Sequence, residues 1–211
     1  MEQQEKKRKG MQVVRPLYDK EERVRCVEVA RRHDMLHGSP YFSWELLMVL
    51  GMNVGLRIGD LSSLKVKHVR APEDWRLFYK AEKTGKELGD GNGQIIPASC
   101  RSTIMRLTEG RDPEDWLFRS RQAKKYSGEP NHISRQRAWE VIRQIADEAD
   151  VHGHIGCHTL RKTFGYLMYQ STNDIEKVKK IFAHSDSKVT NRYIGLEQKR
   201  IDDDIEGLRV I

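Results

Sequence analysis

The sequence has few cysteines, no long apolar run and no start that resembles a signal peptide. Its three cysteines, Cys26, Cys100 and Cys157, are odd in number and far apart, which argues against a disulfide framework and fits a reducing compartment. The longest apolar run, residues 46–50, is far too short to cross a bilayer. The first ten residues are charged and lack the apolar stretch of a signal peptide. These absences argue against membrane-spanning and secreted proteins, and we expect a cytoplasmic globular protein.

Basic residues outnumber acidic ones. The 211 residues include 38 Lys and Arg against 31 Asp and Glu, which gives a net charge of +7 and a pI near 9.3. A basic domain favours polyanions, and DNA is the commonest of these, although many basic proteins bind no nucleic acid. Residues 1–14, with four consecutive basic residues at 6–9, predict a mobile, solvated tail.

Hydrophobic periodicity predicts a mostly α protein with one small antiparallel β-sheet, that is, an α+β fold. Strand-like segments at 75–81 and 94–96 flank a glycine-rich turn. Ser43 and Ser134 stand where helix N-caps are expected. Helices are predicted over residues 18–33, 44–53, 58–64, 99–109, 135–148, 158–170, 174–182 and 188–193, and the polar tail 196–208 is compatible with another.

Several residues suit the cleavage of a phosphodiester without a metal ion. That reaction needs cations on the non-bridging oxygens, a nucleophile for phosphorus and an acid for the leaving sugar oxygen. Arginine suits the first role, because its planar guanidinium binds phosphate oxygens bidentately and stays charged. His158 and Arg161 are three residues apart and share one helical face. His184 precedes Tyr193 by nine residues, and Arg57 comes just after an apolar helix.

Four segments resemble motifs of one family. GLRIGDLSSL (55–64) is similar to the first arginine box of the tyrosine recombinases, or phage integrase family, and HTLRKTF (158–164) to its His-x-x-Arg box. AHSDSKVTNRY (183–193) resembles the final His-and-Tyr box, and KTG (83–85) resembles the segment of the catalytic lysine. The motifs follow the family's order over residues 16–211. The resemblance therefore implies the fold of a tyrosine recombinase catalytic domain.

The resemblance implies a covalent mechanism. Arg57 and Arg161 would bind the scissile phosphate, and Tyr193 would attack it to give a 3′-phosphotyrosyl intermediate and a free 5′-hydroxyl. The tyrosyl ester retains the free energy of the broken bond for rejoining, so the implied reaction needs no ATP, metal or other cofactor. Tyrosine is a poor nucleophile at neutral pH, because its pKa is about 10. Two arginines and a positioned base are the expected remedy.

The other matching residues would handle protons and orientation. By resemblance, Lys83 would protonate the leaving oxygen, or help to do so. His158 would assist proton transfer at Tyr193, and His184 would hydrogen-bond the phosphate. Asp60 would orient this set, although a carboxylate there could also serve only the N-terminus of a helix.

Simpler interpretations compete at some positions. Lys80 and Lys86 lie on the same hairpin as the matched lysine, and exposed strands commonly carry solvated lysines. Tyr166 and Tyr169 compete with the matched tyrosine but fit better as core or groove residues. Ala183 departs from the family, which usually has glycine before this histidine. Four clustered residues invite a zinc interpretation but lack paired ligand spacing, so no metal is predicted: His152, His154, Cys157 and His158.

The implied partner is double-stranded DNA, on which the family assembles as homo-tetramers, with a monomer possible when free, and no membrane is involved. We expect a catalytic domain over residues 15–195. Residues 196–211 would dock on a neighbouring protomer or pack on the chain's own body, with Ile201, Ile205 and Leu208 on one helical face. Family members usually carry a further N-terminal helical domain that grips the other face of DNA. We therefore expect this chain alone to bind DNA weakly and with strong salt dependence.

Two other functions fit part of the pattern. A type IB topoisomerase-like enzyme that relaxes DNA shares much of the chemistry but needs no synapsis of two sites. A DNA-binding regulator without catalysis is the alternative from another class. The complete set of six catalytic residues argues against the regulator, because a pure binder has no need of Tyr193.

Overall fold

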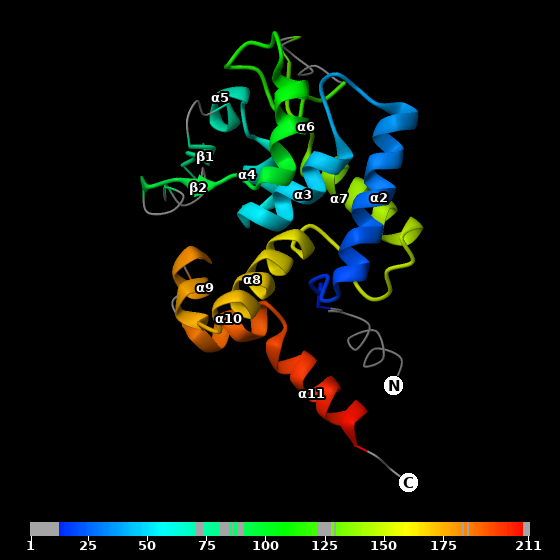
Figure 1. The fold of residues 1–211 in the computed structure, drawn as a ribbon, viewed down its shortest axis with the longest axis vertical. Helices are drawn as coiled ribbons and strands as arrows, with labels where there is room; N and C mark the ends of the chain where they lie inside the picture. The colour runs from blue at the N-terminus through cyan, green and yellow to red at the C-terminus, as the bar shows by residue number, and fades with distance from the viewer. Residues whose placement is uncertain are drawn as a thin grey trace, which may run out of the picture.

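The computed structural model describes residues 13–70, 74–80, 85, 87, 91–121, 128, 130–182, 184 and 186–208. The described helices and strands (Figure 1) are α2 (Lys20–His37), α3 (Trp44–Val54), α4 (Ile58–Ser62), α5 (Val66–Val69), β1 (Arg76–Leu77), β2 (Gln94–Ile95), α6 (Ala98–Thr108), α7 (Arg135–Glu148), α8 (Thr159–Thr172), α9 (Ile175–Phe182), α10 (Ser187–Tyr193) and α11 (Leu196–Gly207). The predicted fold class, mostly α with a small antiparallel sheet, is confirmed. The predicted tail lies outside the described residues except for positions 13 and 14.

Both predicted serine caps begin a helix. Ser43 Oγ accepts a hydrogen bond from the backbone N–H of Leu46 at 3.0 Å, and Ser134 Oγ accepts from that of Arg137 at 3.0 Å. Such caps satisfy N–H groups that have no partner within the helix. The helix α7 runs from Arg135 to Glu148, the bounds that were predicted. The four-residue helix α5 was not predicted, because one turn is too short to show a period.

The sheet is shorter than predicted. Arg76 pairs with Ile95 and Leu77 with Gln94 in an antiparallel register. Among the residues described in this region, the hairpin has one further β-bridge, between Lys80 and Glu87. Between these pairs, the Tyr79 hydroxyl lies 2.9 Å from Ser63 Oγ, at the end of α4.

Two hydrophobic clusters form the core, and α8 belongs to both. The larger cluster takes buried residues from α2 to α7 and the sheet, and Leu160 of α8 extends it. The smaller cluster joins Phe164 and Tyr166 of α8 to Phe182 of α9 and to Ile194. In Figure 1, α8 correspondingly lies between the group α2–α7 and the group α9–α11. The first turn of α8 is thus held where the two clusters meet.

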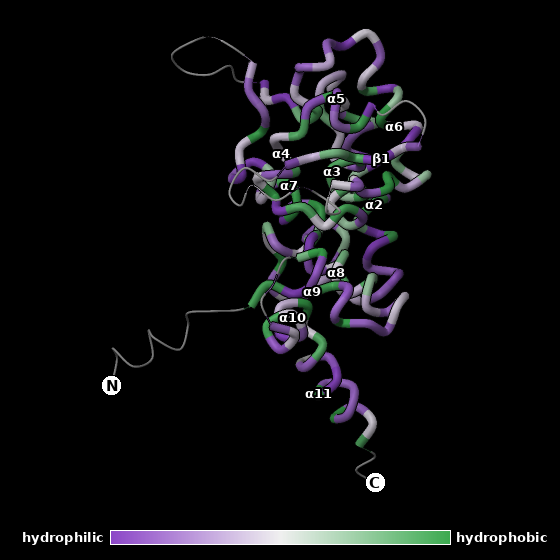
Figure 2. Tube along the Cα trace, turned by 90° about the vertical axis from the view of Figure 1, so that its left-hand side faces the viewer, coloured by the Kyte–Doolittle hydropathy of each residue, from purple (hydrophilic) through white to green (hydrophobic). Residues whose placement is uncertain are grey.

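The C-terminal helix leaves the body of the molecule. Both views show α11 extending away from the other helices (Figure 1, Figure 2). Ile201 and Ile205 of this helix and Leu208 just after it are 51%, 60% and 67% exposed, whereas Leu196 at its start is buried. In the described part of the chain, no helix combines the length and apolar character that crossing a membrane requires.

Candidate active site

Six of the seven predicted site residues gather around Tyr193, the last residue of α10. They come from the α3–α4 junction, from α4, from the start of α8, and from the segment before α10: Arg57, Asp60, His158, Arg161 and His184, with Tyr193 itself. The seventh, Lys83, lies outside the described residues. Its predicted role is therefore untested.

Tyr193 and His158 form a direct pair. The Tyr193 hydroxyl lies 3.1 Å from His158 Nδ1. His158 occupies the N-cap position of α8 rather than the helix itself. Burial, and then the cations Arg135, Lys162, Arg161 and Arg57, lower the pKa of His158 below its usual value. A neutral imidazole at hydrogen-bond distance can accept the phenolic proton.

The hydroxyl of Tyr193 is not activated by the arginines alone. Burial raises the pKa of Tyr193, and this effect exceeds the lowering by Arg161 and Arg57. A buried phenol resists ionisation because the phenolate loses its hydration. Deprotonation at neutral pH therefore depends on a base beside the hydroxyl, and His158 is the group in that place.

Arg161 is fixed by two backbone carbonyls. Its side chain donates to Gly55 O, and Nη2 donates to Phe182 O at 3.2 Å. The guanidinium also lies 4.2 Å from the centroid of the Phe182 ring. The residue is only 7% exposed, and burial lowers the pKa of Arg161. The carbonyls come from the ends of α3 and α9, so three helices set the position of one cation.

Arg57 is the second cation of the set. It is half-buried at the N-cap position of α4. Its side chain makes no hydrogen bond with any residue that the structure describes. Its charge nevertheless reaches the cluster, because it lowers the pKa values of Tyr193, His158 and His184. A guanidinium without a hydrogen-bond partner among the described residues, beside a fixed one, suits an anion that carries several oxygens.

Glycine at position 55 makes the arginine junction possible. Gly55 ends α3 with φ +61°, a left-handed conformation that costs glycine little. A Cβ atom there would overlap the ring of Phe164. The same residue supplies the carbonyl for Arg161, so the turn serves both arginines.

His184 and Asp60 flank the centre. His184 Nδ1 lies 3.1 Å from Thr190 Oγ1, and its ring centroid is 5.1 Å from that of Tyr193. Asp60 is buried, accepts a long hydrogen bond from Tyr79 Oη at 3.4 Å, and raises the pKa of Arg161. The carboxylate thus lies near the arginine that it was predicted to orient.

Sequence reasoning missed several supporting residues. Tyr79, Thr190 and Lys162 contact the predicted set, and none belongs to a quoted motif role. Lys162 could have been found, because it follows Arg161 directly and lies four residues after His158, on the same helical face. Tyr79 gave no local signal, since its partners lie 16 and 19 positions away.

The arrangement offers no metal site within the described part of the chain: no group of three His, Cys, Asp or Glu side chains could hold an ion there.

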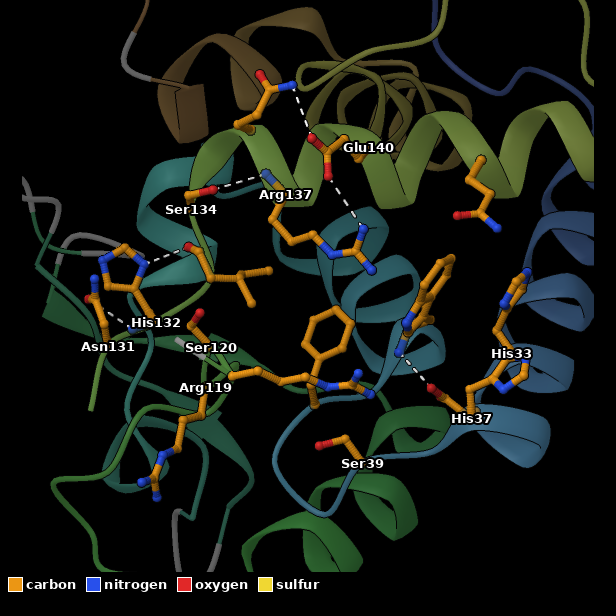
Figure 3. Close-up of a pocket in the computed structure, with 17 residues that line it drawn as sticks. His33, His37, Ser39, Arg119, Ser120, Asn131, His132, Ser134, Arg137 and Glu140 are labelled. Carbon is orange, nitrogen blue, oxygen red and sulfur yellow. Dashed lines mark hydrogen bonds and ion pairs between the residues drawn. The ribbon is translucent and has the colours of Figure 1, made fainter. Parts of the chain in front are cut away.

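A cavity of about 860 Å³ lies elsewhere, between the end of α2, the start of α7 and residues 119–121 and 131–134 (Figure 3). None of the predicted site residues lines it. One face of Trp44 in this cavity stacks on His33 at 4.3 Å, and the Arg137 guanidinium lies 5.6 Å from its ring centroid. The Trp44 ring in this cavity is therefore already in contact with His33 and Arg137.

Comparison with known proteins agrees with this geometry. The model of the phage integrase family matches residues 24–200. The probable integrase/recombinase YoeC of Bacillus subtilis is 35% identical over 153 residues, which cover 72% of this chain and 77% of YoeC. Tyrosine recombinase XerD of Listeria monocytogenes is 24% identical over 163 residues, or 75% of this chain but 52% of XerD. The chain therefore spans about half the length of that relative.

The fold has solved counterparts as well. The XerH site-specific recombinase bound to palindromic difH substrate, in a post-cleavage complex, superposes with a TM-score of 0.63 at 16% identity. The match covers 92% of this chain and 53% of the XerH chain. Sequence motifs, fold and family match agree, and this chain belongs to the phage integrase family, the family of the tyrosine recombinases.

Proposed function

We propose that this chain is a site-specific recombinase that cuts and rejoins double-stranded DNA through a covalent bond between Tyr193 and a 3′-phosphate. The observation that carries the proposal is the 3.1 Å contact between the Tyr193 hydroxyl and His158 Nδ1 beside two arginines. Membership of the phage integrase family and the net charge of +7 support DNA as the partner. The fold shared with the difH-bound XerH supports the same partner.

The first step transfers the phosphate to the enzyme. Arg57 and Arg161 bind the non-bridging oxygens and stabilise the negative charge that grows on them. His158 accepts the phenolic proton as Tyr193 Oη bonds to phosphorus, and the bond from phosphorus to the 5′-oxygen breaks. Lys83 supplies the proton to this oxygen, a role that rests on the KTG motif.

The second step reverses the first with a different strand. A 5′-hydroxyl returns its proton to Lys83 and attacks the phosphotyrosyl ester, the new phosphodiester forms, and the phenol recovers its proton from His158. The ester stores the free energy of the original bond, so rejoining needs no nucleotide triphosphate. Two guanidinium groups, rather than a metal ion, neutralise the negative charge on the phosphate.

A covalent-capture experiment tests the proposal. Wild-type protein is mixed with a library of nicked duplexes of random sequence, in which cleavage near the nick releases a short fragment and prevents rejoining. We expect a protein–DNA adduct that survives denaturing electrophoresis, because the phosphotyrosyl ester is trapped. Sequencing the captured DNA identifies a cognate duplex for all later measurements. Tyr193→Phe should give no adduct.

Tyr169→Phe is the matched control. Tyr169 lies on α8, and its hydroxyl accepts from Arg200 at 2.9 Å rather than facing a predicted base. This variant should form the adduct at the wild-type rate. A wild-type protein that binds duplexes but never forms an adduct would support the DNA-binding regulator instead. Relaxation of supercoiled plasmid that lacks the cognate site would support the topoisomerase-like alternative.

A further inference from the structure

Residues 13–18 lie against one face of α8, and we call this segment the strap. Three buried side chains of this helix hold it. The backbone N–H of Leu17 donates to Thr163 Oγ1 at 2.9 Å, Thr159 Oγ1 donates to Arg15 O at 3.0 Å, and Lys162 Nζ donates to Val14 O at 2.7 Å. The strap is thus tied to the helix that carries the His-x-x-Arg motif.

The far end of the strap reaches the turn that follows the helix of the nucleophile. Tyr18 Oη donates to Gly195 O at 3.1 Å, two residues beyond Tyr193. The Tyr18 ring also packs edge-to-face on Tyr166 of α8, with ring centroids 5.0 Å apart. One short segment therefore contacts α8 and the turn that follows α10.

Lys162 connects the strap to the Tyr193 ring. The residue is only 5% exposed, and its Nζ lies 5.1 Å from the centroid of that ring. Burial lowers the pKa of Lys162, because an ammonium group in the interior loses its hydration. Methionine has a similar length and would fill the same space without that cost. Packing alone therefore does not call for a lysine here.

We propose that Lys162 is a positioning residue for strand cleavage: tethered to the strap at Val14, its ammonium group holds the Tyr193 ring so that the hydroxyl meets His158. The inference rests on the proposed nucleophilic role of Tyr193. Cations favour the face of an aromatic ring. The rings of Phe182 and His184 contact the Tyr193 ring edge-to-face, with centroid-to-centroid distances of 5.6 and 5.1 Å. Lys162 thus contributes a cationic contact to a ring that Phe182 and His184 also hold in place.

The same ammonium group acts on the base. His158 faces Tyr193, and four cations from three parts of the fold lower its pKa in addition to burial: Arg135 of α7, Lys162 and Arg161 of α8, and Arg57 of the α3–α4 junction. Removal of Lys162 should therefore raise the pKa of His158. The acid limb of the cleavage rate should move to higher pH, because a protonated His158 cannot accept the phenolic proton.

Lys162→Met and Thr163→Val separate positioning from anchoring. Both remove a strap contact, but the hydrogen bonds of Thr163 go to Leu17 and Thr159 rather than to Tyr193. With saturating cognate duplex, we expect Lys162→Met to form the adduct at least about tenfold more slowly, a factor equivalent to ~1.4 kcal/mol in the barrier. Its DNA dissociation constant should match the wild type. Thr163→Val should keep the adduct rate even if its unfolding midpoint falls, and Lys162→Arg should recover most of the lost rate.

NMR titration of the histidines gives a second measurement, which needs no DNA. The titration midpoint of His158 should rise in Lys162→Met and stay unchanged in Thr163→Val. Wild-type adduct rates in Lys162→Met, equal slowing in both variants, or an unchanged His158 midpoint would each overturn the inference. None of these results would affect the proposed function, which fails only if wild type forms no Tyr193-dependent adduct.

Discussion

His158 and His184 both lie against Tyr193, and burial holds the pKa of each below the ordinary histidine value of about 6.5. In the unfolded chain both rings are free to bind protons at that ordinary value. Below pH 6.5 the unfolded chain therefore takes up more protons than the folded protein does. Linkage then requires the free energy of unfolding to fall as the pH drops through this window.

Urea unfolding at pH 7.5 and pH 5.5 measures this effect. We expect a lower midpoint at pH 5.5 for the wild type. The double variant His158→Gln with His184→Gln should show a smaller difference between the two pH values, because its glutamines do not titrate. His152→Gln is the control, since His152 is exposed. A double variant with the full wild-type pH dependence would rule out this origin.

At this scale, sequence motifs predicted the identities of the residues around Tyr193 but not how they are held. Arg57, His158, Arg161 and His184 stand in short, recognisable segments, so their types and spacing were readable. The carbonyl of Gly55 that accepts from Arg161 lies 106 positions away from it. Contacts between distant segments depend on packing, which no local pattern contains.

Two glycines at the α3–α4 junction provide a matched pair of tests. Gly55 needs φ +61° and has the Phe164 ring against it, whereas a Cβ atom on Gly59 would meet nothing within 4 Å. Gly55→Ala should lower the free energy of unfolding by at least about 2 kcal/mol, from strain and overlap. Gly59→Ala, inside α4, should raise it by about 0.5–1 kcal/mol, because alanine favours helix.

Thermal and urea unfolding of the two variants would check these values. Gly55→Ala should also slow adduct formation, because the carbonyl that holds Arg161 moves with the turn. Equal stability of the two variants would mean that the turn is not constrained as described.

The elements with strong local signals were the ones that the sequence predicted well. The helix α7 has a serine cap and an apolar stripe, and its predicted bounds are those observed. The helix α2 runs to His37, four residues past its predicted end, because its last turn has no breaking residue before Gly38. The hairpin was predicted longer than its two-residue strands, since residue preference for strands cannot show how many residues form a ladder.

For the whole molecule, the projecting helix α11 points to assembly. Its first residue, Leu196, is buried in the smaller core cluster, whereas Ile201 and Ile205 further along the helix are exposed. We propose that α11 docks on a neighbouring copy when the protein binds DNA. Ile201→Ser with Ile205→Ser should leave the unfolding midpoint unchanged, because both side chains are already in water. The double variant should lose assembly on the cognate duplex.

Sedimentation velocity with and without duplex would measure this assembly. Asp204→Ser, an exposed polar position on the same helix, is the control and should assemble like the wild type. Undiminished assembly of the double isoleucine variant would exclude α11 as the contact.

The strap also sets the order in which the site can form during synthesis. Its three side-chain bonds to α8 span 144, 146 and 148 positions. At ~5–20 residues per second, α8 leaves the ribosome about 7–30 s after the strap. Contacts so distant along the chain form late, since the loop between them must close first. A nascent chain would therefore expose its N-terminal helices well before the site around Tyr193 could form.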